Sequence, residues 1–170
     1  GLTMPIAIEE LFWGDAGIGR SIMAPGLAAA GSACTGTPAQ RMEWVPQCYG
    51  DAKDVKLGAF CVSEPDAGSD VSSLRTRAVY DQATDEWVLN GEKCFIANGA
   101  VGKLFFVSTG TNPDVSIRDG TTEFLVPIDT PGLRVGKVFN KSGWRFYQNG
   151  ELIFENARVP HANIIGKVNE

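Results

Sequence analysis

One short loop carries most of the chemistry that this sequence offers. The run Phe60-Cys61-Val62-Ser63-Glu64-Pro65-Asp66-Ala67-Gly68-Ser69-Asp70 begins apolar and β-prone, then breaks into small and polar residues. Pro65 fixes its own φ and pushes Glu64 into extended geometry, and Gly68 frees the backbone. Such a loop can turn several N–H groups toward one anionic or carbonyl-rich ligand, with the Ser69 hydroxyl beside them. By composition alone, a plain turn at the end of a strand is the simpler interpretation.

Four further segments, taken in order along the chain, favour a ligand-binding loop over a plain turn. They are Asn90-Gly91-Glu92-Lys93-Cys94-Phe95-Ile96-Ala97-Asn98-Gly99, Asp129-Thr130-Pro131-Gly132-Leu133, Gly143-Trp144-Arg145 and Ile153-Phe154-Glu155-Asn156-Ala157-Arg158-Val159-Pro160. Together with the first loop they resemble the acyl-CoA dehydrogenase family of flavoenzymes, in the order and rough spacing of its middle β-domain. Five such motifs in sequence are hard to obtain by chance. The resemblance covers 57–166 clearly and 8–49 more loosely.

The resemblance implies that the cofactor is FAD, held where two loops meet at one end of a β-barrel. An isoalloxazine ring needs a flat apolar surface and hydrogen bonds along its edge. The residues of the first loop that would contact FAD are Phe60, Val62, Ser63, Gly68 and Ser69, with the Ser69 hydroxyl placed for the pyrophosphate or for the neighbouring CoA.

Phe95, Ile96 and Ala97 match the family's second flavin-contacting stretch, in which an aromatic side chain covers the ring. Without the resemblance, core packing is an equally good interpretation of Phe95 and Ile96. Two residues depart from the family pattern, which has tryptophan at Phe95 and a threonine or serine at Ala97. That hydroxyl would bond flavin N5, so its loss is expected to affect the flavin potential or the rate more than binding.

The family reaction is α,β-desaturation of an acyl-CoA thioester in fatty-acid oxidation, with electrons passed to an electron-transfer flavoprotein. Its glutamate base lies in a C-terminal helical domain that would begin near Glu170. We therefore assign no catalytic residue here, and expect little turnover from these residues alone. Arg118 is a candidate for a CoA phosphate, although a solvated loop charge is the simpler interpretation. The complete enzyme is expected to form a homo- or hetero-oligomer.

Two alternatives remain open. The chain can be a non-catalytic flavin- or acyl-CoA-binding subunit that assembles with an active partner. Ala97 and the bulky segment Phe146-Tyr147-Gln148-Asn149, where the family commonly has small residues, motivate this hypothesis. A β-barrel with no flavin role requires all five motif matches to be coincidental.

The composition sets the broad class of protein. The 170 residues are 44% hydrophobic and 21% charged, as in ordinary globular proteins, and the net charge of −5 disfavours nucleic acid. A polyanionic cofactor would need locally placed cations, for which the candidates are Arg75, Arg77, Lys93, Lys103, Arg118 and Arg145. No apolar run approaches the roughly 20 residues of a membrane span, and no secretory signal is visible.

The cysteine and histidine content argues against a metal site. Four cysteines without a Cys-x-x-Cys pair, joined by a single histidine, make zinc binding and a structural disulfide improbable. The expected compartment is reducing. With the family resemblance this means the bacterial cytoplasm, or the mitochondrial matrix in a eukaryote.

The periodicity predicts an α+β fold, with a short α-helical segment followed by an antiparallel β-barrel or sandwich. Residues 1–52 are expected to form part of a helical domain, with a break near Pro25 and a capped helix start at Thr37. From this last helix Met42, Val45 and Cys48 would face inward. Residues 53–170 are expected to form the β-domain. Its expected strands are a hairpin of 76–80 and 87–91, followed by 103–109, 122–128, 133–139 and 151–159.

Overall fold

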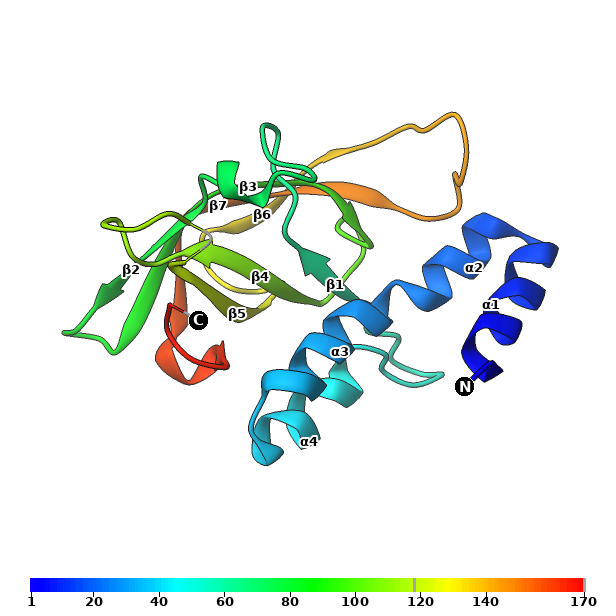
Figure 1. The fold of residues 1–170 in the computed structure, drawn as a ribbon, viewed down its shortest axis with the longest axis horizontal. Coiled ribbons are helices and arrows are strands. Elements are labelled where there is room, and N and C mark those ends of the chain that lie inside the picture. Colours follow the sequence, from blue (N-terminus) through cyan, green and yellow to red (C-terminus); the bar gives the residue numbers. More distant parts are fainter. Residues whose placement is uncertain (118, 170) are drawn as a thin grey trace.

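Four α-helices precede one eight-stranded sheet in the computed structural model, which describes residues 1–117 and 119–169 (Figure 1). The helices are α1 (Thr3–Gly14), α2 (Ala16–Met23), α3 (Pro25–Thr35) and α4 (Pro38–Gln47). The strands are β1 (Gly58–Cys61), β2 (Arg77–Asp81), β3 (Glu86–Ala97), β4 (Leu104–Gly110), β5 (Thr121–Pro127), β6 (Leu133–Val138), β7 (Asn149–Pro160) and β8 (Ile164–Ile165). The α+β class is thus confirmed.

The helix boundaries follow local sequence signals. Pro25 begins α3 and separates it from α2, as the sequence predicts. Thr37 and Gln40 form the predicted capping box of α4, in which each side chain bonds the backbone N–H of the other residue. Asp15 caps α2 by accepting a hydrogen bond from the Ile18 N–H at 2.7 Å. The prediction for Met42 is wrong: its side chain is 82% exposed, because the inward face of α4 is formed by Trp44 and Val45.

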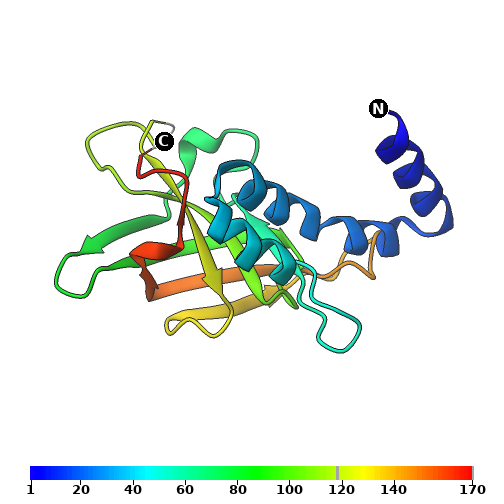
Figure 2. The same cartoon turned by 90° about the horizontal axis from the view of Figure 1, so that it is seen from below.

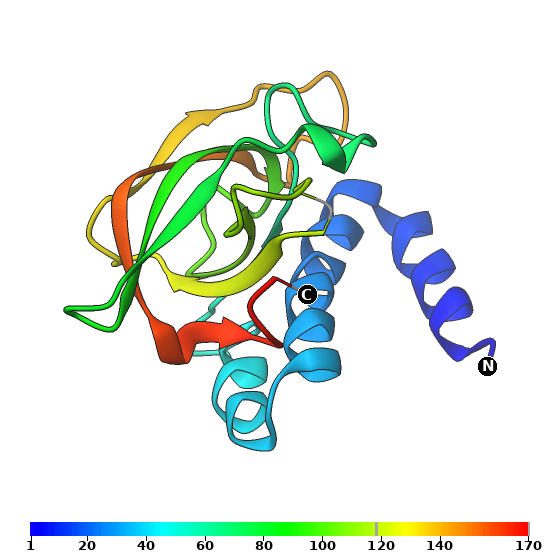
Figure 3. The same cartoon turned by 60° about the vertical axis from the view of Figure 1, so that its left-hand side comes forward.

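The sheet is mostly antiparallel and strongly curled (Figure 3). Its path runs β6-β7-β3-β2-β4-β5-β8, and β2 and β3 form the predicted hairpin. The sheet differs from the antiparallel prediction at β4, which pairs in parallel with β1 and, through Arg77 and Gly110, with β2, so the sheet is mixed. β6 and β8 are the two ends of this path, and within the described residues they do not pair with each other. The sheet is therefore an open, sandwich-like barrel rather than a closed one.

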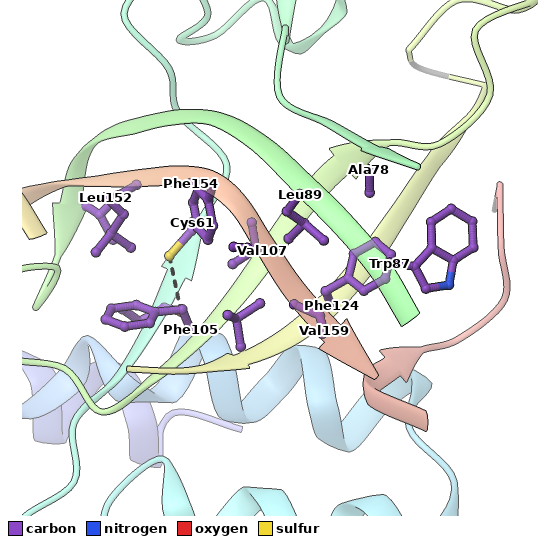
Figure 4. Close-up of a cluster of buried hydrophobic side chains, with 14 of the residues drawn as sticks. Cys61, Ala78, Trp87, Leu89, Phe105, Val107, Phe124, Leu152, Phe154 and Val159 are labelled. Atoms are coloured by element: carbon purple, nitrogen blue, oxygen red, sulfur yellow. Dashed lines mark hydrogen bonds between the residues drawn. The ribbon is translucent and has the colours of Figure 1, made fainter. Parts of the chain in front are cut away.

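The main core lies inside the curl of the sheet (Figure 4). Alternate residues of β4 face this core, among them Phe105 and Val107, while Phe106 faces the other side and packs under α3. A Cβ at Gly31 would lie 2.7 Å from the Phe106 ring, so glycine allows α3 to approach the sheet closely. Both faces of β4 are therefore covered, which explains why every residue of this strand is buried.

The helices differ in how they meet the sheet (Figures 1 and 2). α3 packs on β1 and β4, whereas α1 stands apart from the sheet and has no buried residue. Three large apolar side chains of α2 and α3 are exposed, namely Ile18, Ile22 and Leu27. No helix in the described part is long and apolar enough to cross a membrane. The division between residues 52 and 53 stays a prediction.

Candidate functional site

The loop that follows β1 meets the end of β3. The Cys94 N–H donates to the Ser63 carbonyl at 2.9 Å, which extends the contact between the two segments beyond β1. Beside this bond, Lys93 Nζ donates to the Val62 carbonyl at 3.0 Å and to Glu64 Oε1 at 2.8 Å. The structure therefore brings together the two loops that the sequence singled out, although they are about thirty residues apart.

Lys93 and Glu64 form a buried ion pair at this junction. Their side chains are 0% and 4% exposed. Glu64 also accepts the N–H groups of Arg75 and Thr76, at 2.6 and 3.1 Å. A lysine and a glutamate are almost never fully buried unless they are paired. Lys93, counted above among the cations available to a polyanionic ligand, is therefore not available. Its hydrogen bonds to Val62 and Glu64 link the second loop to the first.

The pKa of Glu64 responds to two opposing effects. Burial raises it, but the hydrogen bonds from Lys93, Thr76 and Arg75 outweigh burial and leave the pKa below its ordinary value. Because the folded carboxyl binds its proton less tightly than the unfolded one, the carboxylate stabilises the fold at neutral pH. This stability is lost as the pH falls through the lowered pKa.

This gives a prediction for acid pH. The free energy of unfolding should differ most between wild type and Glu64→Gln at neutral pH, and the difference should shrink below pH 4.5, the ordinary glutamate pKa. Urea unfolding of both proteins between about pH 7 and about pH 3 measures it. A difference that stays constant over this range would show that the charge of Glu64 does not contribute.

A β-bulge sets the direction of the second loop. The register of β3 against β7 shifts between Lys93 and Ile96, and Phe95 has a φ of +56°. A bulge re-aims side chains, and a positive φ is strained for a bulky residue. As a result Ile96 faces the main core, while the Phe95 ring is 62% exposed and stacks on Phe139 at 4.5 Å. Ile96 can therefore meet a ligand only through its backbone.

Ala97 packs against Tyr147, which belongs to the bulky segment 146–149 where the family commonly has small residues. Ala97, Ala24 and Tyr147 form one buried cluster, so the connection between β6 and β7 reaches both the helices and the end of β3. Asn149 joins the same two segments, since its Nδ2 donates to the Phe95 carbonyl at 2.7 Å and to the Tyr147 hydroxyl at 3.0 Å. Ala97, where the family has a threonine or serine, is thus in contact with Tyr147 of the bulky segment that replaces the family's small residues.

The first loop makes a tight turn, and two of its hydroxyl groups are available to a ligand. Glu64 and Ala67 exchange backbone hydrogen bonds at 2.9 and 3.1 Å. Within the described residues, the hydroxyls of Ser63 and Ser69 have no hydrogen-bond partner. Gly68 has no positive φ, and a Cβ built there would meet nothing within 4 Å. Neither its backbone nor its neighbours in the chain therefore require a glycine.

The remaining predicted residues behave differently. The Phe60 ring stacks on Phe106 at 5.5 Å, in the interface between sheet and helices, and Val62 packs against a small buried cluster with Leu74. Both are partly buried, so only part of each side chain faces outward. Arg118 lies outside the described residues. No group of three His, Cys, Asp or Glu side chains in the described ranges is arranged to hold a metal ion.

Comparison with known proteins identifies the family. The model of the acyl-CoA dehydrogenase middle domain matches residues 59–157. The acryloyl-CoA reductase (NADH) of Anaerotignum propionicum is 40% identical over 132 residues, which are 78% of this chain and 32% of that protein. The chain therefore spans about a third of the length of this relative.

Solved structures agree. Butyryl-CoA dehydrogenase of Megasphaera elsdenii superposes with a TM-score of 0.87 at 34% identity, over 96% of this chain and 42% of the other. A glutaryl-CoA dehydrogenase of Mycobacterium smegmatis, in complex with FADH2, gives a TM-score of 0.82 at 31% identity, over 96% and 40%. The family resemblance inferred from five motifs is confirmed, and this chain belongs to the acyl-CoA dehydrogenase family.

Proposed function

We propose that this chain forms the FAD-binding side of an acyl-CoA dehydrogenase that desaturates acyl-CoA thioesters between the α- and β-carbons. Membership of the family supports the reaction class. The observation that carries the proposal is the junction of the two loops, fastened by the Cys94–Ser63 backbone bond and by the buried pair of Lys93 and Glu64.

The residues at the junction fit FAD. Phe95 is a large apolar ring exposed on a strained bulge, and strain of this kind clusters at functional sites. The hydroxyls of Ser63 and Ser69 are open donors for the oxygen atoms of a dinucleotide. The open space at Gly68 admits a ligand that a side chain would displace. When bound, FAD supplies the acceptor for the hydride that leaves the β-carbon.

The chain's own residues would position the cofactor and exclude water. In this proposal the Phe95 ring covers one face of the isoalloxazine, and Ser63 and Ser69 donate hydrogen bonds to its polar parts. Lys93 and Glu64 keep the two loops at a fixed spacing. Ala97 offers no side-chain hydroxyl, so the flavin edge beside it is held by backbone groups only.

We place the proton-abstracting base outside these residues. A base must have a free carboxylate within hydrogen-bond reach of the α-carbon. Glu64 is held by Lys93 and two backbone N–H groups, and Glu123 accepts from the Ser108 hydroxyl at 2.7 and 2.8 Å. A further segment or subunit would supply the base, and an electron-transfer flavoprotein would take the electrons. The proposed compartment remains the bacterial cytoplasm or the mitochondrial matrix.

Flavin retention tests the proposal. The purified protein, loaded with FAD and passed over a desalting column, should keep the flavin absorption band at about 450 nm. Phe95→Ala should bind FAD roughly tenfold more weakly, because stacking and apolar burial are both lost. The matched control is Phe146→Ala, which removes a ring that is equally exposed, at 65%, but lies on another loop. Equal weakening in both variants, or no FAD binding by wild type, would contradict the proposal.

A non-catalytic flavin- or acyl-CoA-binding subunit is the second candidate function. Ala97 and its contact with Tyr147 favour it, because the position beside the reacting flavin edge is altered. Adding an acyl-CoA to the complete flavin-loaded protein, with the segment or subunit proposed to supply the base present, separates the two candidates. Bleaching of the flavin band supports the dehydrogenase, whereas bound flavin that stays oxidised supports the subunit.

A further inference from the structure

Positive charge gathers where α2 faces the connection between β6 and β7. The chain has a net charge of −5, yet no aspartate or glutamate occurs in residues 16–42 or in residues 130–150. Arg20 on α2 and the connecting segment that carries Lys141 and Arg145 come together around Tyr147, whose ring centroid lies 5.6 Å from Arg20 Cζ and 3.7 Å from Lys141 Nζ. The two acid-free segments thus form one surface.

The cations of this surface have only neutral partners. Lys141 Nζ donates to the Tyr147 carbonyl and to Asn149 Oδ1, both at 2.5 Å. Arg145 Nε donates to the Lys141 carbonyl at 2.9 Å. Throughout the described ranges, no carboxylate forms an ion pair with Arg20, Lys141 or Arg145. Elsewhere in the chain, Arg75, Arg134 and Arg158 each pair with a carboxylate.

A cavity of about 680 Å³ opens beside these cations. The apolar residues that line it are Leu57, Val101 and Phe146, and the polar residues are Ser21, Asn98, Arg145 and Gln148. None of the residues proposed to contact FAD lines it. A cavity lined by apolar side chains together with an arginine and amide groups suits a ligand that has an anionic end and a hydrocarbon body.

Asn98 adds an independent observation. Its side chain is 1% exposed, and within the described residues its Nδ2 has no hydrogen-bond partner. A buried amide without a partner is unfavourable, and because Asn98 lines the cavity, a hydrogen-bond acceptor on a bound ligand is one way to satisfy it. Asn98 and Arg145 both line the cavity, so each has a donor group on the side from which a ligand would bind.

From these observations we infer that the cavity is a binding site for a small amphipathic carboxylate, in which Arg145 and Asn98 bind the carboxylate and Leu57, Val101 and Phe146 contact the hydrocarbon part. Arg20 and Lys141 contribute positive potential from the Tyr147 side. The inference does not require FAD to be bound.

The test uses the full 170-residue chain labelled with ¹⁵N and two probes, hexanoate and inorganic phosphate, at constant ionic strength. Hexanoate should shift the side-chain amide signals of Asn98, which are assigned by their loss in Asn98→Gly. Arg145→Gln should weaken hexanoate binding roughly tenfold, because a charge-assisted hydrogen bond is removed. Lys137→Gln, which removes a cation of β6 that does not line the cavity, should bind like wild type.

Three outcomes would overturn the inference. One is the absence of any Asn98 shift with hexanoate. Another is equal binding by wild type and Arg145→Gln. The third is a shift with phosphate but none with hexanoate, which would show a simple anion site without an apolar part. Flavin retention measured on the same samples keeps this result separate, since a chain that binds hexanoate but no FAD contradicts only the proposed function.

Discussion

Replacing Lys93 by methionine is expected to lower the free energy of unfolding by about 3–5 kcal/mol, because it leaves the Glu64 carboxylate buried without its charged partner. Methionine keeps the length of the side chain, so the loss would come from the charge and the two hydrogen bonds to Val62 and Glu64. Denaturant unfolding at neutral pH measures the change.

A matched control separates the ion pair from the general effect of losing a lysine. Lys137→Met removes an exposed lysine from β6 and should change stability by less than about 0.5 kcal/mol. Changing both partners, as Lys93→Met with Glu64→Leu, should recover only part of the loss, since the N–H groups of Arg75 and Thr76 would lose their acceptor. A Lys93→Met protein as stable as the Lys137 control would rule out a structural role for the pair.

The second large effect is expected at Ala97. Introducing the family's threonine by Ala97→Thr should lower the free energy of unfolding by about 1–3 kcal/mol, because the added atoms overpack the buried contact with Tyr147 and Ala24. The variant Ala97→Thr with Tyr147→Ser should be more stable than the sum of the two single changes predicts, since the smaller serine makes room for threonine. Thermal or denaturant unfolding of the four proteins completes the cycle.

Flavin spectra of the same four proteins test whether position 97 also affects the cofactor. If the small residue at position 97 is a consequence of Tyr147 packing, the double variant should recover stability. With FAD bound as proposed, it should also shift the flavin absorption or potential, because a hydroxyl would again lie beside the flavin. Strictly additive effects on stability would show that the two positions are independent, despite their contact.

Features with a local cause could be predicted from the sequence. The capping box at Thr37, the break at Pro25 and the hairpin of β2 and β3 depend on residues close together in the chain, and all three were predicted. The strand β4 was also predicted, since a short uninterrupted apolar run is typical of a buried strand. The motifs that identified the family are of the same local kind.

Features that depend on distant residues could not be predicted in this way. Glu64 and Lys93 each look like ordinary surface charges, and only the fold places one against the other inside the protein. The bulge at Phe95 could not be predicted because the residue with positive φ is not a glycine. Met42 shares its spacing with the inward residues of α4, yet it lies outside the strip that the sheet covers. The spacing of apolar residues predicts which side of a helix is buried, but not how many residues on that side the sheet covers.

The ion pair at the loop junction also bears on how a cofactor enters. Because both charges and both backbone N–H groups acting on Glu64 belong to the polypeptide, the spacing of the two loops does not depend on any bound molecule. A preorganised apoprotein loses little conformational entropy on association, so more of the interaction energy remains as affinity. If FAD binds as proposed, its loading would resemble the docking of a rigid body, and its release would leave the two loops at the same spacing.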